Sequence, residues 1–193
     1  MRHWYLPRPA LILNRLTDLD DLELVSAVIN DYSIDALKIV SGGQTGVDQA
    51  ALRAAIDCGI PHGGWCPRGR KCEDGTIPPI FQLSEMESDQ YAERTEQNVI
   101  DSDATLIIYR AKISGGTKLT KKFAVRHNKN HLLLDLLSDV PVVNICDWIV
   151  KNNVRVLNVA GPRESNCPGI FQSSRKLLKL VFRKMISDAK RST

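Results

Sequence analysis

The chain lacks any apolar run long enough to cross a membrane, so an integral membrane protein is not expected. Its N-terminus has only a brief apolar stretch, from Ala10 to Leu13, without a cleavage-site pattern, which argues against a secretory signal peptide. The cysteines number 5, an odd count, and their irregular spacing forms no disulfide framework. A reducing compartment fits this cysteine usage, and we therefore expect a cytoplasmic protein.

Strong charge of one sign is also absent. The formal net charge is +4 for 193 residues, and aromatic residues are not interleaved with basic ones. Such a mild charge suits a small anionic ligand but falls short of what nucleic-acid binding requires. Hydrophobic residues make up 43% and charged residues 25% of the chain, which is typical of a globular protein with a full core.

Metal-ligand spacing is missing as well. The nearest candidates are His62, Cys66 and Cys72, whose separation matches no common zinc pattern. Asp101 and Asp103 lie where a helix should end, a position that favours helix closure over metal binding. We therefore expect no metal site built from this chain's own side chains.

What the sequence does contain, from Leu37 onward, is an alternation of strands and helices. This pattern predicts a parallel sheet covered by helices on both faces. The predicted strands span residues 37–40, 62–65, 104–109, 131–134 and 154–159. The predicted helices span residues 47–58, 89–102, 142–151 and 171–189, and one more runs from a glycine turn at 113–117 to about residue 128. A loop rich in glycine, proline and charge is expected over residues 67–79.

The first 35 residues stand apart from this alternation. An arm with Pro7 and Pro9 precedes a predicted helix that takes Thr17 as its N-cap. We expect residues 1–35 to form this arm and helix, and residues 36–193 to form a ligand-binding domain. The helix would pack on the core or on a second subunit.

The segment 37–51 has the pattern of a strand, a glycine-rich turn and a helix. Gly42, Gly43 and Gly46 permit unusual backbone angles and a close approach of a ligand to the main chain. The helix directs its free N–H groups and positive dipole end at the turn, an arrangement that binds phosphate. The turn is neither a Walker loop nor a GxGxxG motif, because no Lys follows Gly46 and the glycine spacing differs. A tight turn that binds nothing is the alternative.

Three strand–turn units end alike, at residues 41–46 (SGGQTG), 114–117 (SGGT) and 161–165 (GPRES). In an open α/β sheet such turns lie at the carboxyl ends of the strands, where ligands bind. Strand 154–159 is almost continuously apolar, the pattern of a strand buried on both faces. We therefore expect it inside the sheet beside strand 37–40, with Arg163 and Gln44 at one pocket.

The residues IVSGGQTGVDQAAL, at 39–52, resemble the SGG-x-x-G-[VI]-D-x-x-A stretch of a Rossmann-like superfamily. That superfamily includes the DNA-processing protein DprA, YpsA and the "lonely guy" (LOG) phosphoribohydrolases. Residues 94–120 look like its arginine-bearing helix, its S-D-A strand and its second glycine turn. In DprA and YpsA relatives a strand ending in a G-S-R turn comes first, whereas the comparable strand here, VRVLNVAGPRES, comes last. This order looks like the circularly permuted YpsA branch, also named molybdenum-cofactor carriers, to which residues 64–78 and 94–99 are similar too.

The resemblance covers about residues 37–171. It implies a Rossmann-like, three-layer α/β/α fold with a mainly parallel sheet, circularly permuted, to which the N-terminal helical extension is added. For this branch it implies binding of molybdenum cofactor, a pterin with a phosphate tail and a dithiolene-held metal, by a carrier that protects and delivers it. A nucleotide is the other ligand that the superfamily implies. We expect a homo-oligomer, with molybdoenzymes or cofactor-insertion proteins as the partners that such a carrier serves.

The expected ligand-binding residues come from the three turns, a basic cluster in the loop and one helix face. They are Ser41, Gly42, Gly43, Gln44, Thr45, Gly46, Asp48, Arg68, Arg70, Lys71, Arg94, Asn98, Ser114, Gly115, Gly116, Thr117, Gly161, Pro162, Arg163, Glu164 and Ser165. The basic cluster would add charge-assisted contacts to phosphate or molybdate oxygens. Arg94 and Asn98 share a helix face, which lines the cleft or is solvated. Arg163 faces the ligand or pairs with Glu164 on the surface, and Asp48 contacts the ligand or only stabilises its helix.

One departure from the resemblance concerns catalysis. The LOG hydrolases carry a catalytic Glu three residues after the Thr of their glycine turn, and this chain has Thr120 at that place. We therefore expect no catalytic residue, unless Glu93, Glu96 or Glu164 reaches the cleft. A carrier is the favoured function. The alternatives are a nucleotide-processing enzyme, against which the missing Glu argues, and a nucleotide sensor, which needs the same cradle as a carrier.

Overall fold

The computed structural model describes residues 34–139 and 141–191. The predicted N-terminal arm and the helix beginning at Thr17 lie outside the described residues. The helices of the described part are α2 (Val47–Asp57), α3 (Tyr91–Ile100), α4 (Gly115–Arg126), α5 (Val142–Lys151) and α6 (Ile170–Ala189). The strands are β1 (Lys38–Val40), β2 (His62–Gly63), β3 (Trp65–Cys66), β4 (Lys71–Cys72), β5 (Gly75–Thr76), β6 (Ser84–Glu85), β7 (Ala104–Tyr109), β8 (Asn130–Asp135) and β9 (Val156–Ala160).

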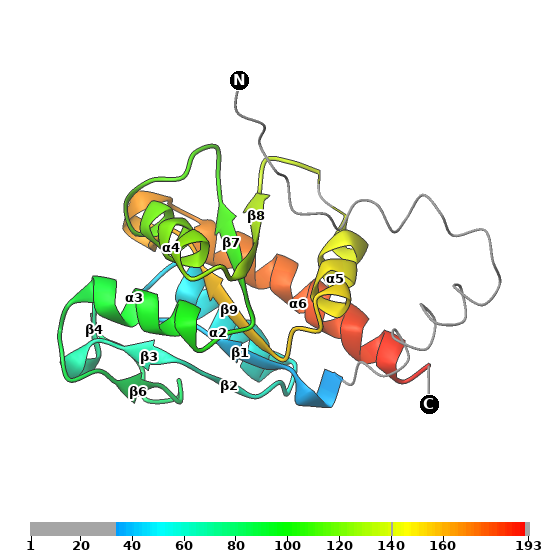
Figure 1. Cartoon of the computed structure of the whole chain (residues 1–193), viewed down its shortest axis with the longest axis horizontal. Helices are drawn as coiled ribbons and strands as arrows, with labels where there is room; N and C mark the ends of the chain where they lie inside the picture. The colour runs from blue at the N-terminus through cyan, green and yellow to red at the C-terminus, as the bar shows by residue number, and fades with distance from the viewer. Residues whose placement is uncertain (1–33, 140, 192–193) are drawn as a thin grey trace, which may run out of the picture. The chain divides into compact units, whose positions relative to one another are not determined.

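Five of these strands form one parallel sheet in the order β2-β1-β9-β7-β8, as Figure 1 shows. β9 pairs with β1 on one side, where Ile39 lies opposite Leu157, and with β7 on the other, where Leu106 lies opposite Val159. The prediction that the last strand lies inside the sheet beside the first is therefore confirmed. Because the strands are parallel, their carboxyl ends meet along one edge.

The central strands are buried because their side chains are apolar on both faces. Leu106, Ile107 and Ile108 of β7 are fully buried, as are Leu157 and Val159 of β9. Such continuous apolar runs are typical of strands covered on both sides.

The buried side-chain amide of Asn158 in β9 also has a hydrogen-bond partner. Its Nδ2 donates to the hydroxyl of Thr105, which faces it on β7, at 3.3 Å.

Helices cover both faces of this sheet, which confirms the predicted α/β/α layering. α2 packs on α6 and α6 on α5, whereas α3 packs on α4. Right-handed crossovers explain this division, because the chain crosses the sheet in one direction through α2 and α5 and in the opposite direction through α3 and α4. The two layers are therefore α2, α5 and α6 on one face, and α3 and α4 on the other (Figure 1). None of the helices in residues 34–139 and 141–191 is long and apolar enough to span a membrane.

The segment between β2 and α3 is more ordered than the sequence predicts. The predicted strand 62–65 divides at Gly64, so that β2 joins the main sheet while β3 pairs with β6. Within the predicted loop 67–79, β4 and β5 form an antiparallel hairpin. Arg70 anchors this hairpin, because its guanidinium donates hydrogen bonds to four carbonyl groups between residues 77 and 83.

Candidate ligand-binding site

The turns that follow β1 and β9 meet at the carboxyl edge of the sheet. The Val47 N–H donates to the Pro162 carbonyl at 3.2 Å, and the Glu164 N–H donates to the Thr45 hydroxyl at 3.3 Å. Below them, the Ser41 hydroxyl donates to the Val159 carbonyl at 2.6 Å. The two turns therefore form one surface, which we call the composite edge and define as residues 41–48 and 161–165.

Gly46 is where the two turns come closest. Its φ is +75°, and a Cβ at this position would lie 2.4 Å from the Pro162 carbonyl oxygen. No side chain fits there without moving one of the turns. Gly46 is also the residue that caps α2, so the start of this helix is built directly against the turn after β9.

Glu73, at the turn of the β4–β5 hairpin, reaches into the composite edge. Its Oε2 accepts from the Ser165 hydroxyl at 2.5 Å, and its Oε1 accepts from the Ser165 N–H at 3.2 Å and from the Thr45 hydroxyl. The Arg163 Nε lies 3.8 Å from Oε2. One carboxylate from a third segment therefore joins both turns. Sequence reasoning missed Glu73, because it lies in a charged loop where only its adjacency to the basic cluster set it apart.

The environment of Glu73 favours its charged form. Burial acts to raise the pKa of this carboxyl, but the hydrogen bonds from Ser165 and Thr45 and the charge of Arg163 outweigh it. The pKa of Glu73 is therefore lowered from its ordinary value, and the side chain is a carboxylate at neutral pH.

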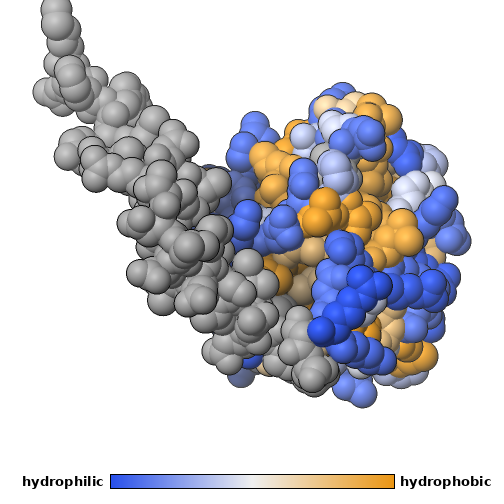
Figure 2. Space-filling model, turned by 90° about the vertical axis from the view of Figure 1, so that its right-hand side faces the viewer, coloured by the Kyte–Doolittle hydropathy of each residue, from blue (hydrophilic) through white to orange (hydrophobic). Residues whose placement is uncertain are grey.

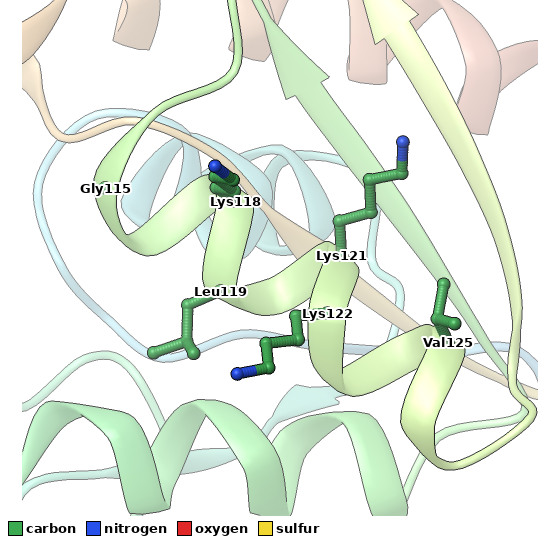
Figure 3. Close-up of a pocket in the computed structure, with 6 residues that line it drawn as sticks. All are labelled: Gly115, Lys118, Leu119, Lys121, Lys122 and Val125. Atoms are coloured by element: carbon green, nitrogen blue, oxygen red, sulfur yellow. The ribbon is translucent and has the colours of Figure 1, made fainter.

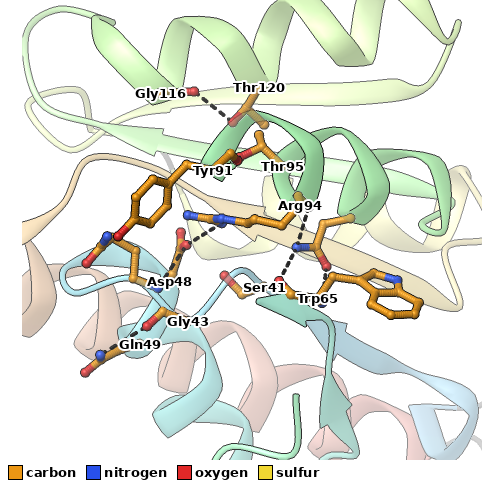
Figure 4. Close-up of polar contacts among 12 residues, drawn as sticks. Ser41, Gly43, Asp48, Gln49, Trp65, Tyr91, Arg94, Thr95, Gly116 and Thr120 are labelled. Atoms are coloured by element: carbon orange, nitrogen blue, oxygen red, sulfur yellow. Dashed lines mark hydrogen bonds and ion pairs between the residues drawn. The ribbon is translucent and has the colours of Figure 1, made fainter. Parts of the chain in front are cut away.

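Asp48, an acidic residue of the composite edge, is paired with Arg94 of α3. The Arg94 Nη1 donates to Asp48 Oδ2 at 3.0 Å, and the two side chains are 11% and 5% exposed. Figure 4 shows the guanidinium reaching from α3 toward Asp48 at the start of α2. The guanidinium lies so close to Gly42 that a Cβ there would be 1.3 Å from Nη1. Burial raises the pKa of Asp48 above its ordinary value, although the charge of Arg94 opposes the rise.

The turn after β1 is closed in this structure by its own side chains. Residues 41–48 are buried almost throughout. The Gln44 N–H donates to Asp48 at 3.3 Å, and the Thr45 N–H donates to the Gln44 Oε1 at 3.0 Å. The turn is therefore no open cradle here, and an anion that binds its N–H groups has to take the place of these internal partners. Two buried donors beside this turn, Gln44 Nε2 and Arg94 Nε, have no hydrogen-bond partner among the described residues.

The second glycine turn has the opposite character. Ser114, Gly115 and Gly116 are exposed, and the Ser114 side chain makes no capping hydrogen bond to α4. No hydrogen bond or ion pair among residues 34–139 and 141–191 joins this turn to the composite edge. Thr120 is buried, and its hydroxyl donates to the Gly116 carbonyl at 3.0 Å, so the position that is a catalytic Glu in the LOG hydrolases serves here to brace the helix.

The remaining predicted residues divide between the composite edge and other places. Arg163 lies at the edge, with its guanidinium 5.7 Å from the centre of the Tyr91 ring of α3. Asn98 instead fixes α3 to β3, because its side chain bonds the N–H and the carbonyl of Trp65, both at 2.9 Å. The Glu164 carboxylate accepts hydrogen bonds from the N–H groups of Gly169 at 2.5 Å and Phe171 at 2.9 Å. It therefore holds the start of α6.

Within the described residues, no hydrogen bond or ion pair joins the basic cluster of the loop to the composite edge. Arg68 is exposed, and Lys71 pairs with Asp89 at 3.2 Å on the surface. Arg70 faces the backbone carbonyls of its own loop.

Of the glutamates that were candidates to replace the missing catalytic residue, Glu93 is exposed, and Glu96 pairs with His127 and Arg126 at the end of α4. Glu164 lies in the composite edge, but its carboxylate holds the start of α6.

Two hollows on the described surface lie away from the composite edge. One of about 550 Å³ runs along α4, and Figure 3 shows its lining residues on that helix; they are Gly115, Lys118, Leu119, Lys121, Lys122 and Val125. Another of about 290 Å³ lies on α6 between residues 172 and 183. Neither includes a residue of the composite edge. In the described ranges no group of three or more His, Cys, Asp or Glu side chains is placed to hold a metal ion.

The surface outside these hollows is mixed. Figure 2 shows hydrophobic residues lying among hydrophilic ones on the face that it presents. Large hydrophobic side chains exposed in the described part of the chain are scattered over several elements; they are Ile80, Tyr91, Ile100, Val125, Leu137, Val143 and Leu180. Single exposed hydrophobic residues of this kind are ordinary and do not by themselves indicate an interface.

Comparison with known proteins agrees with the permuted strand order. The model of the circularly permuted YpsA SLOG family matches residues 39–182. A crystal structure from Syntrophus aciditrophicus SB, named "Putative molybdenum carrier protein", is 44% identical in sequence to this chain, with a TM-score of 0.72. The match covers 76% of this chain and 96% of the Syntrophus chain. (E)-4-Hydroxy-3-methyl-but-2-enyl diphosphate reductase aligns at 10% identity over 86% of this chain and 65% of its own, and its TM-score of 0.31 is too low to carry an argument.

A search of curated proteins gives no significant match. The family match spans most of the described residues and includes both turns of the composite edge and the strand β9 whose late position marks the permutation. The chain belongs to the circularly permuted YpsA SLOG family.

Proposed function

We propose that this protein binds molybdenum cofactor at the composite edge and acts as its carrier. The observation that carries the proposal is the adjacency of β1 and β9, which puts the glycine turn 41–46 in hydrogen-bond contact with Glu164, the neighbour of Arg163. Ligands of open α/β sheets bind where strand ends converge in this way. The relative from Syntrophus aciditrophicus SB, whose name is that of a molybdenum carrier, supports the choice of cargo.

The donors of the composite edge match the polar parts of this cargo. The phosphate tail of the pterin calls for N–H groups, hydroxyls and a guanidinium, which the edge supplies through Thr45, Arg163 and Ser165. Gln44 Nε2 and Arg94 Nε, two buried donors beside this turn that have no partner in the described part of the chain, provide further hydrogen bonds for a polar ligand that opens the turn. Under this proposal the exposed start of α4 forms an outer part of the same site.

A carrier has no bond to break, and the second glycine turn is consistent with that. Thr120 is buried with its hydroxyl engaged, so it offers neither a carboxylate nor a free proton carrier. We infer that the cargo is held and released unchanged. Protection requires that the pterin be shielded from solvent, and the burial of residues 41–48 supports a site of that kind.

Mass spectrometry of the small molecules that leave the heat-denatured protein tests this function most directly. We expect molybdopterin or its oxidation products after expression in a host that makes the cofactor. A second experiment measures transfer of the bound cofactor to a cofactor-free molybdoenzyme.

Arg163→Ala should weaken ligand binding by about 1–3 kcal/mol without unfolding the protein. Arg126→Ala, an arginine of the exposed pair with Glu96, is the matched control. Recovery of a nucleotide alone would overturn the carrier function.

A second candidate is a nucleotide-processing enzyme, and one observation favours it. Asp48 has a raised pKa beside the Arg94 guanidinium, and a carboxyl group of that kind is suited to general acid–base work. Release of free base from nucleoside monophosphates at roughly 1 per second or faster would establish this function instead. We expect no such turnover, because Asp48 is fully enclosed and already paired.

We further propose that the protein works in the cytoplasm as a homo-oligomer and delivers its cargo to molybdoenzymes or to proteins that insert the cofactor. The five cysteines are free thiols, which fits a reducing compartment. Sedimentation equilibrium of the purified chain tests the oligomeric state, and a mass equal to that of one chain at all concentrations would contradict it.

A further inference from the structure

The Glu73 carboxylate lies among donors that belong to other segments. Two hydroxyls, one backbone N–H and one guanidinium converge on it from Thr45, Ser165 and Arg163. Charge-assisted contacts from hydroxyl, amide and guanidinium donors are those that bind phosphate oxygens. In this structure the anion that they bind is a side chain of the protein itself.

The hairpin that carries Glu73 is attached to the composite edge through this residue. The Glu73 N–H donates to Gln44 Oε1 at 2.9 Å, and its carboxylate makes the remaining contacts. Asp74, Gly75 and Thr76 beyond it are exposed, and a Cβ added at Gly75 would meet nothing within 4 Å. Cys72, the residue before Glu73, is buried. Displacement of the Glu73 side chain therefore disturbs the exposed residues 74–76 and leaves Cys72 in the core.

An independent observation points to a ligand at the same place. Gln44 is only 5% exposed, and its side-chain amide lies against Glu73. The Oε1 of that amide accepts two hydrogen bonds, whereas the Nε2 has no partner in the described residues. Buried polar atoms are rarely left unpaired, so each such case calls for an explanation. A carboxylate has two oxygens, whereas a phosphate monoester has three acceptor oxygens and carries more charge.

We propose that Thr45, Arg163 and Ser165, with Gln44 beneath them, form a phosphate subsite in which Glu73 stands in for the phosphate until a ligand displaces it. The proposal rests on the proposed function only in requiring a ligand with a phosphate group, which both molybdopterin and a nucleotide have. Glu73 is ionised at neutral pH, so it competes with the ligand as one anion with another. A site that is open only part of the time binds with an apparent affinity reduced by the open fraction.

Titration calorimetry with inorganic phosphate at fixed ionic strength tests the subsite. Glu73→Gln keeps the size of the side chain and removes its charge, so we expect it to bind phosphate about tenfold tighter than the unmodified chain. Asp74→Asn removes the same charge one residue away and should change the affinity by less than about twofold. Adding Ser165→Ala to Glu73→Gln should abolish the gain.

Phosphate affinity of Glu73→Gln that equals or falls below that of the unmodified chain would overturn the proposal. If Glu73→Gln does not fold, the ¹⁵N spectrum of the unmodified chain decides. Saturating phosphate should then shift the Ser165 amide and the Gln44 side-chain amide signals, and shifts confined to the start of α4 would exclude the subsite. A gain in phosphate affinity without any molybdopterin binding would contradict the carrier function and leave the subsite standing. Molybdopterin binding that Glu73→Gln does not strengthen would contradict the subsite and leave the carrier function standing.

Discussion

The tripeptide Ser-Gly-Gly occurs twice after a strand of the same sheet, at 41–43 and at 114–116, and the two copies have opposite environments. The first is fully enclosed, with the Ser41 hydroxyl bonded to β9 and a guanidinium lying against Gly42. The second is exposed, with Ser114 leaving the start of α4 uncapped. Position in the sheet does not explain the difference, because β1 and β7 each lie between β9 and an edge strand. The first turn is covered by Arg94 and by the turn after β9, whereas residues 110–113 separate the second turn from the end of β7. Equal local sequences therefore give an enclosed turn in one place and an open helix start in the other.

The largest expected effect is a difference in the free energy of unfolding when a glycine of each turn is replaced by alanine. Gly46→Ala should lower the free energy of unfolding by about 3 kcal/mol or more, because the Cβ meets the Pro162 carbonyl and the backbone angle is one that only glycine adopts readily. Gly116→Ala should leave this free energy unchanged or raise it by up to about 1 kcal/mol, since nothing lies within 4 Å of its Cβ. Urea denaturation of both variants checks this, and equal losses would mean that the first turn relaxes freely.

The ion pairs of the two regions should differ almost as much. Arg94→Met leaves Asp48 buried without its partner and should cost about 3–5 kcal/mol of unfolding free energy. Arg126→Met removes an arginine that is 54% exposed from its pair with Glu96, and should cost less than about 1 kcal/mol. Thermal and chemical denaturation provide the measurement. A loss at Arg94 no larger than that at Arg126 would show that Asp48 is protonated or solvated in the folded chain.

The two serines allow a finer comparison. Ser41→Ala breaks a buried hydrogen bond to the Val159 carbonyl and should cost roughly 1–2 kcal/mol. Ser114→Ala should change the stability by less than about 0.5 kcal/mol, because the Ser114 side chain makes no capping bond. Differential scanning calorimetry resolves shifts of this size. A clear loss at Ser114 would mean that its hydroxyl caps α4 in solution.

The smallest expected effect depends on pH and reports on Glu73. The pKa of this carboxyl is lowered in the folded chain, so its contribution to stability is present above the unfolded value of 4.5 and is lost as pH falls through the folded value. The unmodified chain should therefore exceed Glu73→Gln in stability at pH 7 by about 1 kcal/mol or less, and the difference should vanish as the pH falls below the folded pKa. Denaturation midpoints between pH 3 and 7 test this. A difference that grows toward low pH would have the wrong sign.

The sequence predicted the sheet well because its signals are local and redundant. The apolar run at 156–160 indicated a strand buried on both faces, and the structure places β9 between β1 and β7. The contacts within the site were harder to predict, because they join segments that are distant in the chain. Glu73 bonds Ser165, which is 92 residues away, and no local pattern marks that pair. Arg70 shows the same limit, since a basic residue in a loop predicts an anion partner, whereas its guanidinium binds backbone carbonyls.

The central place of β9 also affects how the chain is made. β1 and β7 do not pair with each other, because each pairs with β9. The ribosome synthesises β9 more than a hundred residues after β1. Until residues 156–160 have emerged from the ribosome, a nascent chain lacks both the central strand of its sheet and Arg163. The contacts that join β1 and β7 to β9 therefore form late, because they link residues that are far apart in the sequence. Synthesis therefore imposes an order of events, in which the sheet is completed before the composite edge. Under the proposed function, an unfinished chain lacks the edge that binds the cargo and so cannot take it up.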